Sequence, residues 1–552
     1  MQSQWMKMVS LSFIIFHFSF SPAKAQLILS GSIQSDMLVP RNDRETGAEK
    51  TGDFLTNTYA DLMLQSEYVD AGVRLEFMEY PLPGFEADFE GWGVPHLWVK
   101  GRMGKVELTC GSFYEQFGSG FILRTYEERS LGIDNSLFGA RVVVKPLKGV
   151  TLKALSGAQR RYWEWNKSLI SGADAEVSLG EFIPALQRKG SNVMLGGSWV
   201  NKYENSDEKL YASPIYRYRF PKFVNAWDAR VNFSHGPWNV LGEYAMKSDD
   251  PSFANDYIYK KGSAVMLSGS YSQKGLSVLL QAKRSEDMSF KSTSDVAKAI
   301  GMSSTINHLP AFTQDQTYSL AALYPYATQL ADGEWAYQAE IGYNFKRKTW
   351  LGGKYGMNVK ANLSYVRAID RQFYDENSDL ITQTNGYTSK FFKWGDQTYY
   401  RSIDITLSRK LSKTFKLNLM YLNQMYNQAV VEGHGDMVYA NVFIADGKYQ
   451  FSSKTTLRAE LQYLTTKQDK GDWAYGLLEL SLAPHWMFTV SDMWNCGETN
   501  LHYYQGLVTY NIGQHRIQAG YGRTREGLNC SGGVCRRVPA STGWTVSYNY
   551  NF

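Results

Sequence analysis

The sequence predicts an all-β protein, a single large antiparallel transmembrane β-barrel of about 24 strands, within the range 22–26. Three observations predict this fold. Apolar and polar residues alternate over many segments, which is typical of strands with one apolar and one polar face. Many of these segments run for about 9–13 residues, which is long enough for a tilted bilayer crossing. Short and long connections also alternate along the chain, as in outer-membrane barrels.

The alternation is clearest in five segments of the chain, which are 335–346, 357–365, 403–408, 457–463 and 544–552. In the first segment, the apolar side chains of Tyr337 and Ile341 share one face. Gln338 and Glu340 share the opposite face. Tyr and Trp residues stand near the strand ends, where outer-membrane barrels carry aromatic girdles at the membrane–water interface.

The connections set the predicted strand count. Short ones are expected near Asp70, 103–104, 148–149, 236–237, 274–275, 412–413, 452–453, 484–485 and 513–514, with two less clear turns near 185 and 350. Longer polar segments lie between them: 38–53, 81–95, 203–221, 285–316, 368–399 and 524–540. This places both chain ends on the side of the short turns. Residues 317–325 (TYSLAALYP) fit either a strand or part of a long loop.

The N-terminal segment is predicted to be a secretory signal peptide covering residues 1–25. A positive start at Lys7, an apolar centre from Met8 to Phe20 and the small-x-small box Ala23-Lys24-Ala25 have the expected order. The apolar run is too short for a transmembrane helix. The barrel is then expected over residues 26–552. No separate plug domain is expected before the first strand, which argues against a TonB-dependent transporter.

The last segment alternates and stops on an aromatic residue. Tyr548, Tyr550 and Phe552 share one face of it. This ending resembles the C-terminal strand by which the barrel assembly machinery recognises bacterial outer-membrane barrels. The resemblance implies that these three residues form an assembly signal, and that the chain partners this machinery and outer-membrane lipids.

Three stretches are the most distinctive: 111–120 (GSFYEQFGSG), 127–135 (EERSLGIDN) and 530–536 (CSGGVCR). They are similar to an uncharacterised family of Bacteroidota outer-membrane β-barrel proteins. The resemblance implies the fold and a location in the bacterial outer membrane, reached by export. It implies no activity.

Composition excludes several classes of function. The net charge of +5 over 552 residues is mild and shows no basic cluster, so no nucleic-acid partner is expected. Four cysteines are too few for a disulfide framework. The sequence contains no G-x-S-x-G, H-E-x-x-H or P-loop motif, which lowers the expectation of an enzyme. No cofactor and no metal are expected.

The polar strand faces are expected to line the lumen. The residues expected there include Glu340, Lys346, Lys360, Lys416, Arg458, Glu460 and Arg516. Both signs of charge are mixed, whereas a strongly ion-selective pore would show one dominant sign. A conducting channel and a lumen cross-linked by ion pairs both fit. A barrel of this size has a wide lumen, which water, inward-folded loops or a partner must fill.

Residues 111–135 are the best candidate for a constriction or inward loop. The segment carries Glu115, Arg124, Glu127, Glu128, Arg129 and Asp134, with glycines at 111, 118 and 120. Glycine permits tight backbone paths, and paired charges could hold the loop against an oppositely charged wall. The alternative is an ordinary exposed loop with solvated charges.

The cysteines suggest one disulfide. Cys530 and Cys535 flank Gly532 and Gly533 in the last long loop and are expected to be joined, because an exported protein meets an oxidising compartment. Cys496 could compete for a partner. Cys110 falls in a strand and is expected to be a small packed residue. A metal or redox site is the less favoured alternative, since a lone CxxxxC pair has poor zinc spacing.

Other clusters allow both a purely structural interpretation and one in which they bind a ligand. Glu432, His434 and Asp436 could ligate a metal but lie in a glycine-rich loop, where solvated side chains are the simpler expectation. Asp249, Asp250 and Asp256 lack the spacing of a calcium loop. The aromatic groups Tyr162, Trp163 and Trp165, and Tyr374, Phe391 and Phe392, are expected at the membrane interface, with sugar stacking as the alternative.

Taken together, the sequence favours an integral outer-membrane barrel acting as a porin-like or substrate-specific channel for solute passage or binding. A non-enzymatic barrel subunit of a larger outer-membrane assembly, docking surface lipoproteins or secretion components, is the second hypothesis. An outer-membrane hydrolase is the third.

Overall fold

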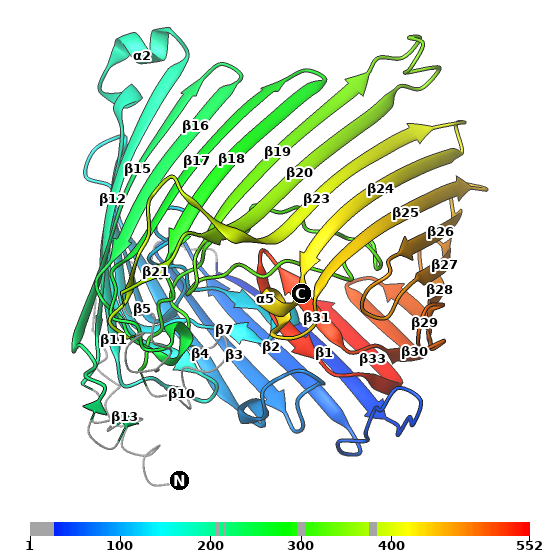
Figure 1. Ribbon diagram of the computed structural model, residues 1–552, viewed down its shortest axis with the longest axis horizontal. Coiled ribbons are helices and arrows are strands. Elements are labelled where there is room, and N and C mark those ends of the chain that lie inside the picture. Colours follow the sequence, from blue (N-terminus) through cyan, green and yellow to red (C-terminus); the bar gives the residue numbers. More distant parts are fainter. Residues whose placement is uncertain (1–26, 206–209, 214–215, 295–303, 375–383) are drawn as a thin grey trace.

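The wall of the molecule is one closed antiparallel sheet (Figure 1). The computed structural model describes residues 27–205, 210–213, 216–294, 304–374 and 384–552. Within these residues 24 strands form the barrel, which confirms the predicted fold and strand count. The wall strands are β1 (Ile28–Pro40), β2 (Leu55–Gln65), β3 (Val69–Met78), β4 (Gly91–Met103), β5 (Val106–Phe113), β8 (Leu137–Val144), β9 (Val150–Arg161), β11 (Leu169–Ser178), β12 (Ser191–Tyr203), β15 (Phe223–His235), β16 (Trp238–Lys247), β17 (Gly262–Gln273), β18 (Leu276–Glu286), β19 (Glu334–Phe345), β20 (Met357–Ile369), β23 (Trp394–Lys410), β24 (Phe415–Asn427), β25 (Met437–Gln450), β26 (Thr455–Thr465), β27 (Trp473–Leu482), β28 (Trp486–Asn495), β29 (His502–Ile512), β30 (His515–Thr524) and β33 (Ser541–Asn551).

The two ends of the sheet meet at a seam between β1 and β33. The pairing runs from Ser32 opposite Asn551 to Pro40 opposite Gly543. It is extended by hydrogen bonds in both directions between Gly31 and Phe552, at N···O distances of 3.0 and 2.9 Å. Closure leaves no edge strand in the wall, which is the condition for a sheet in hydrocarbon. Tyr550 lies at this seam and stacks on His515, with ring centroids 4.3 Å apart.

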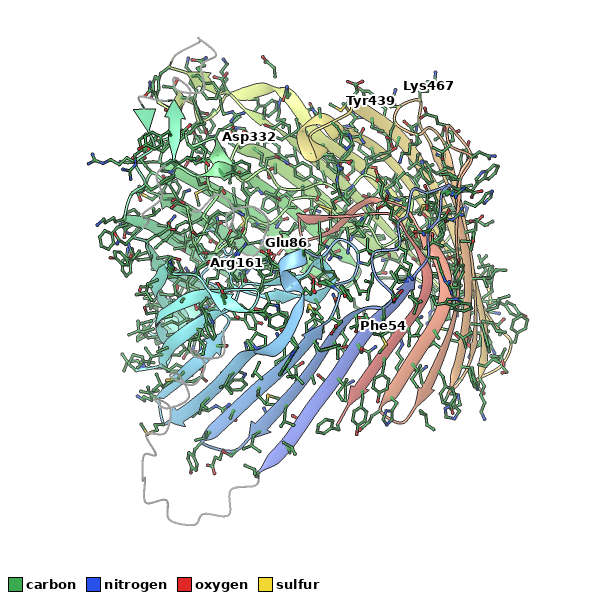
Figure 2. The ribbon with its side chains drawn as sticks, turned by 90° about the horizontal axis from the view of Figure 1, so that it is seen from below. Phe54, Glu86, Arg161, Asp332, Tyr439 and Lys467 are labelled. Atoms are coloured by element: carbon green, nitrogen blue, oxygen red, sulfur yellow. A yellow bond between two sulfur atoms is a disulfide. The ribbon has the colours of Figure 1, made fainter. Side chains whose placement is uncertain are left out.

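The connections divide the barrel into a short-turn end and a long-connection end. Short turns join β2 to β3, β4 to β5 and the following alternate pairs. The predicted turns near 185 and 350 are both present at the short-turn end: 179–190 carries η3 (Leu179–Glu181) and α2 (Pro184–Arg188), and 346–356 joins β19 to β20. Tyr439 and Lys467 lie close together at the long-connection end in Figure 2.

Side chains alternate across the wall as the sequence predicts. In β25, Tyr439, Phe443 and Tyr449 point outward and are 51%, 50% and 42% exposed. Val442 and Asp446 point inward and are buried. The two tyrosines near the strand ends and the phenylalanine between them match an apolar belt flanked by interfacial aromatic rings. No helix among the described residues is long and apolar enough to cross a membrane.

Cys110 corrects one expectation of the sequence. The pattern predicts a packed residue, but Cys110 is exposed on the outward face of β5. Leu108, two residues earlier, is exposed on the same face. Successive side chains of a strand point to opposite faces, so the alternation directs the Cys110 thiol toward the surroundings of the barrel.

Several long connections turn inward and lie inside the cylinder (Figure 1). The first, 114–136, carries β6 (Glu127–Glu128), η2 (Arg129–Leu131) and β7 (Ile133–Asp134). The second is described over 287–294 and 304–333, and it includes 317–325, which form no strand. The third carries α5 (Gln428–Glu432), and the fourth is the hairpin of β31 (Gly527–Ser531) and β32 (Val534–Val538). We call the described residues 114–136, 287–294 and 304–333 the plug.

The remaining small elements lie in other connections. They are η1 (Ala87–Phe89), β10 (Glu164–Trp165), β13 (Tyr211–Ser213), β14 (Tyr216–Arg217), η4 (Phe253–Asn255), β21 (Gln372–Phe373) and β22 (Tyr387–Thr388). β10 pairs with the end of β9, which is why the connected sheet holds 25 strands in all.

The outward position of Phe443 gives a stability prediction. Phe443→Arg should destabilise the barrel by about 2–4 kcal/mol, because it puts a cation near the middle of the apolar belt. Tyr439→Arg, on the same face near the strand end, should cost only about 0–1 kcal/mol. Urea unfolding of both variants in lipid vesicles measures the difference. Equal losses at the two positions would contradict the membrane orientation.

Candidate functional site

The plug has an apolar core of its own inside the lumen. Phe117, Phe121, Ile122 and Leu123 from its first segment are fully or almost fully buried. They pack in one cluster with residues of the second segment: Met288, Phe290, Ile306, Leu309, Phe312 and Leu320. Inward-facing wall residues such as Val442 complete the cluster. Burial of each large apolar side chain stabilises by about 1.5–3 kcal/mol, so this part of the lumen is a packed core.

Backbone hydrogen bonds join the two plug segments. Arg124 N–H donates to the Ile306 carbonyl at 2.9 Å, and His308 N–H donates to the Gly120 carbonyl at 2.9 Å. The Asn135 amide donates to the Thr305 carbonyl at 2.8 Å. Gly120 has φ of +97°, a conformation that favours glycine. The segments are far apart in sequence, yet they form one body.

A network of arginines and carboxylates fastens the first plug segment to the wall. Arg74 of β3 contacts four carboxylates, which are Asp61 at 2.8 Å, Glu127 at 2.8 Å, Asp134 at 3.0 Å and Glu76 at 3.6 Å. Arg160 of β9 contacts Glu76 at 2.6 Å and Asp134 at 2.5 Å. Buried charges need such partners, because an unpaired charge away from water is costly. We call these residues, together with Arg129, the arginine–carboxylate network.

The predicted constriction residues all lie in the plug. Arg129 bridges Glu127 at 2.5 Å and Asp61 at 2.8 Å. Glu115 contacts Arg141 of β8 at 2.5 Å and Lys153 of β9 at 3.0 Å. The Arg124 guanidinium lies over the Tyr126 ring, 4.6 Å from its centroid. Glu128 accepts from the Ser130 hydroxyl at 2.7 Å, within the segment. Contacts of this kind hold the segment inside the barrel.

Asp134 and His308 are among the titratable groups of the plug that have shifted pKa values. Burial alone would raise the pKa of Asp134, but Arg160 and Arg74 beside it lower that pKa to about 2. Burial, together with the nearby charges of Arg124 and Lys283, lowers the pKa of His308 to about 3. At neutral pH the plug therefore holds a charged Asp134 and a neutral His308.

The inner wall differs between its two halves. Near the long-connection end, Lys283 and Glu334 form an ion pair at 2.8 Å with both side chains 0% exposed. Nearer the short-turn end, Lys360 and Glu340 pair at 2.7 Å with side chains 36% and 26% exposed. The second pair is therefore accessible to solvent, whereas the first is not.

The other predicted lumen residues lie in the half toward the short turns. Arg458 contacts Asp446 at 2.9 Å and also pairs with Glu460. Lys416 and Arg516 are exposed near the short-turn ends of β24 and β30. Lys346 is a correction: it lies one residue beyond β19 in the 346–356 connection and is no part of the wall, because the strand ends at Phe345.

The β31–β32 hairpin contacts most of the inward-folded segments. A disulfide joins Cys530 and Cys535 across it, and Cys110 and Cys496 are free. Arg536 donates to the Ser130 carbonyl at 3.0 Å. Thr328 N–H donates to the Gly533 carbonyl at 2.9 Å. Polar contacts, rather than a large apolar core, thus hold the hairpin in the lumen.

A cavity of about 500 Å³ lies between this hairpin and the seam side of the wall. Wall residues from β1, β2, β29, β30 and β33 line it, including Gln34, Gln518 and Ser547. Arg129, Ser130 and Arg536 line it from the lumen. Part of its surface is apolar, contributed by residues such as Leu38 and Phe85. The cavity is the space that the packed core leaves open beside the wall.

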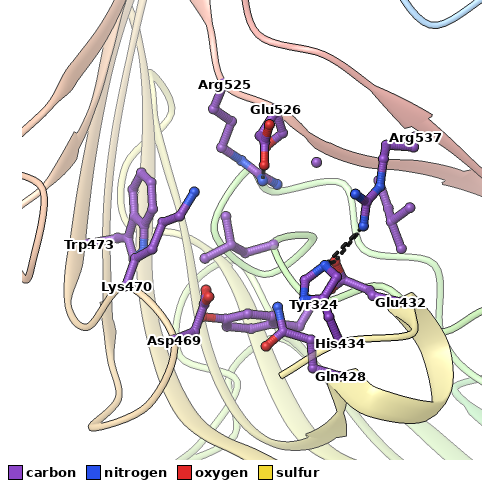
Figure 3. Close-up of a pocket in the computed structure, with 13 residues that line it drawn as sticks. Tyr324, Gln428, Glu432, His434, Asp469, Lys470, Trp473, Arg525, Glu526 and Arg537 are labelled. Atoms are coloured by element: carbon purple, nitrogen blue, oxygen red, sulfur yellow. Dashed lines mark hydrogen bonds and ion pairs between the residues drawn. The ribbon is translucent and has the colours of Figure 1, made fainter. Parts of the chain in front are cut away.

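A second, smaller pocket lies at the long-connection end (Figure 3). Its volume is about 110 Å³. Four connections contribute to it, with these charged or titratable residues: Glu432, His434, Asp469, Lys470, Arg525, Glu526 and Arg537. Arg537 donates to the His434 ring at 2.9 Å. Among the described residues no group of three or more His, Cys, Asp and Glu is arranged to hold a metal ion.

The acidic clusters have internal partners. Glu432 lies 3.5 Å from His434 and 3.9 Å from Arg537, while Asp436 lies in the same connection without completing a ligand set. Asp250 is paired with Lys202 at 2.6 Å and with Lys247 at 3.6 Å. Such ion pairs occupy the oxygen atoms that a cation would need.

The first aromatic cluster departs from the predicted position at the membrane interface. Tyr162 is 6% exposed and packs edge-to-face on Phe89, with ring centroids 4.6 Å apart. Trp163 donates its indole N–H to the Glu90 carbonyl at 3.1 Å. The 79–90 connection covers these rings, which is why Tyr162 is buried. Trp165 packs on Phe138 at 4.7 Å.

The second aromatic cluster is divided. Phe391 packs on Trp335, with centroids 5.7 Å apart. Phe392 and Tyr374 are 87% and 66% exposed. Exposed rings of this kind fit either interpretation of the sequence.

Sequence reasoning misses two parts of the site. The pattern over 285–316 predicts a polar outer loop, but its described residues 287–294 and 304–316 fold into the lumen, while 295–303 lie outside the described residues. The sequence feature that could have predicted this inward position is the presence of large apolar residues among polar ones, which are Met288, Phe290, Ile306 and Phe312. The wall partners Arg74 and Arg160 are also missed, because their role depends on carboxylates far away in sequence.

Comparisons with known proteins give a family and a fold likeness. The family described as "Family of unknown function (DUF6029)" matches residues 1–552. No curated protein matches the sequence. Three solved structures from Pseudomonas aeruginosa resemble the barrel, with 9–10% sequence identity to this chain. A double mutant of the ferric enterobactin receptor PfeA has a TM-score of 0.45 and 10% identity, and the match covers 95% of this chain and 80% of that chain. The siderophore receptor PirA has a TM-score of 0.40 and 9% identity, and the match covers 95% of this chain and 80% of that chain. The outer membrane protein opdK has a TM-score of 0.35 and 10% identity, and the match covers 96% of this chain and 99% of that chain.

Proposed function

The chain belongs to the DUF6029 family of unknown function, and we propose that it is an outer-membrane β-barrel that binds or passes a polar solute beside its own plug. The proposal includes export by the predicted signal peptide, assembly by the barrel assembly machinery and origin in the Bacteroidota. It is a non-enzymatic role, with outer-membrane lipids as the surroundings of the wall.

The cavity of about 500 Å³ carries the proposal. It has the size of a small-molecule site, and polar groups converge on it from the wall and from the plug. Gln518 of β30 donates to Thr509 at 3.1 Å at one side of it. Arg129 and Arg536 bring positive charge from the lumen side. A solute crossing the barrel along the seam side would meet these groups.

Conductance in planar bilayers tests the proposal with a matched pair of variants. Gln518→Trp should lower the single-channel conductance, because the indole fills part of the cavity. Ile517→Trp is the control, since Ile517 is 43% exposed on the outward face and a tryptophan there replaces one lipid-facing side chain with another. Unchanged currents in Gln518→Trp, or equal loss in both variants, would refute passage through this cavity.

The packed core of the plug favours a second candidate function. A lumen filled by side chains from β5 through β27 fits a sealed barrel that serves as a subunit of a larger outer-membrane assembly and docks surface lipoproteins. Such a protein would show no conductance, and native purification from membranes would recover stoichiometric partners. Currents through the wild-type barrel without any bound partner would favour the channel instead.

A further inference from the structure

The small pocket at the long-connection end has two cations without acidic partners. No carboxylate of the described residues lies within 4.0 Å of the Arg525 guanidinium or of the Lys470 ammonium. The Arg525 side chain donates from Nη1 to the Glu526 carbonyl at 2.8 Å. A guanidinium has five N–H donors, so Arg525 keeps donors for another group. Both side chains line the pocket (Figure 3).

The acidic residues of the pocket either form hydrogen bonds with other groups or lie more than 4.0 Å from Arg525 and Lys470. Asp469 accepts from the Tyr324 hydroxyl at 3.0 Å. Glu432 accepts from the Tyr426 hydroxyl at 2.9 Å and faces His434 and Arg537. Glu526 is exposed and forms no ion pair with Arg525 or Lys470 in the described part of the chain. The three acids Glu432, Asp469 and Glu526 equal the three cations of the pocket in formal charge, but none of them forms an ion pair with Arg525 or Lys470 in the described part of the chain.

Two further observations indicate a missing partner. Burial lowers the pKa of Arg525, which means that nearby oxygen atoms do not fully offset the loss of water around its charge. Trp473 lines the same pocket, is 2% exposed and has an indole N–H without a hydrogen-bond partner among the described residues. Unpaired buried donors of this kind are rare, because each one costs free energy.

We propose that this pocket binds one small anionic group, a carboxylate, phosphate or sulfate, carried by a solute that enters from the long-connection end. Arg525 supplies the planar fork that matches two oxygen atoms of such a group, and Lys470 supplies a point charge. The volume of about 110 Å³ takes a single functional group, well below the space that a whole drug-sized molecule fills. The assignment to a solute deepens the proposed function and rests on it.

The position of the pocket favours a soluble anion over a lipid headgroup. Trp473, Tyr324 and Leu323 belong to the packed cluster inside the barrel, so the interior of the barrel forms one side of the pocket. Its residues come from four connections: the plug, the α5 segment, 469–473 and the start and end of the β31–β32 hairpin.

Titration of the purified full-length barrel in detergent with inorganic phosphate tests the proposal. Isothermal calorimetry should show saturable binding, and Arg525→Gln or Lys470→Gln should weaken it by about ten- to hundredfold, because hydrogen bonds to charged groups contribute this much. Lys467→Gln is the matched control, since Lys467 belongs to the same connection, is exposed and lies outside the pocket. It should leave the affinity unchanged.

Several outcomes would overturn the proposal. They are the absence of saturable binding of phosphate, sulfate and acetate, unchanged affinity in Arg525→Gln, or equal weakening in Lys467→Gln. If the protein binds lipopolysaccharide micelles but not phosphate, the ligand of the pocket is a lipid headgroup and not a soluble anion. The proposed passage of a solute can be refuted separately from the anion site. If phosphate binding depends on Arg525 but the currents in Gln518→Trp are unchanged, the anion site is supported and passage through the larger cavity is refuted.

Discussion

Removal of the β31–β32 hairpin should raise the single-channel conductance of the purified barrel several-fold. Residues 527–538 would be replaced by a short Gly-Ser link between β30 and β33. The hairpin lines the cavity of about 500 Å³ beside the seam and also cavities of about 110, 130 and 210 Å³ around it. Without the hairpin these spaces join into one wider opening.

The barrel should survive this deletion. The hairpin residues are mostly exposed or half-buried, and none belongs to the apolar cluster of the plug. The control is a replacement of similar length at the opposite end, in which a short turn takes the place of residues 346–356. That connection is largely exposed and should leave the currents unchanged. A hairpin deletion with wild-type currents would show that the plug alone seals the lumen.

Arg160→Leu should destabilise the folded protein by about 3–5 kcal/mol. The Arg160 and Glu76 side chains are each 2% exposed, and the Asp134 side chain is 8% exposed. Loss of the guanidinium leaves two buried carboxylates with Arg74 alone to offset their desolvation, at 3.0 Å from Asp134 and 3.6 Å from Glu76. Urea unfolding in lipid vesicles, followed by tryptophan fluorescence, measures this loss.

Arg161→Leu is the neighbouring control. Arg161 pairs with Asp88 at 3.1 Å, and the Asp88 side chain is 61% exposed, so the loss should stay near or below about 1 kcal/mol. Glu76→Leu combined with Arg160→Leu should recover part of the stability, because it removes the buried carboxylate that lies farther from the remaining guanidinium of Arg74. A loss in Arg160→Leu no greater than in Arg161→Leu would contradict the role of the arginine–carboxylate network.

The barrel can be predicted from the sequence because each strand and each short turn depends on residues that are close together in the chain. A strand such as β25 shows its two faces in its own alternation, and the turns around 236–237 and 513–514 lie where the apolar pattern breaks. Neither feature depends on residues far away. The count of strands then follows from the connections, since each short turn joins two neighbours in the sheet.

The contents of the lumen are only partly predictable. Residues 114–136 combine paired charges with glycines, so an inward path can be inferred from the segment itself. Residues 287–294 and 304–333 cannot be placed this way, because their burial depends on Phe117 and Phe121 from another connection. The alternation also misleads near the long-connection end, where inward positions such as Val438 and Ala440 are apolar because they face the plug.

The barrel wall should be stiffer on one side than on the other, because the packed apolar cluster contacts only part of its circumference. Wall residues of that cluster come from strands between β5 and β27, so this arc is braced from within by tightly fitted side chains. The arc through β29, β30, β33 and β1 borders empty space instead, and it contains the join between first and last strand. Lateral pressure from the bilayer would therefore flatten the cylinder along one compliant side, while the opposite side keeps its curvature.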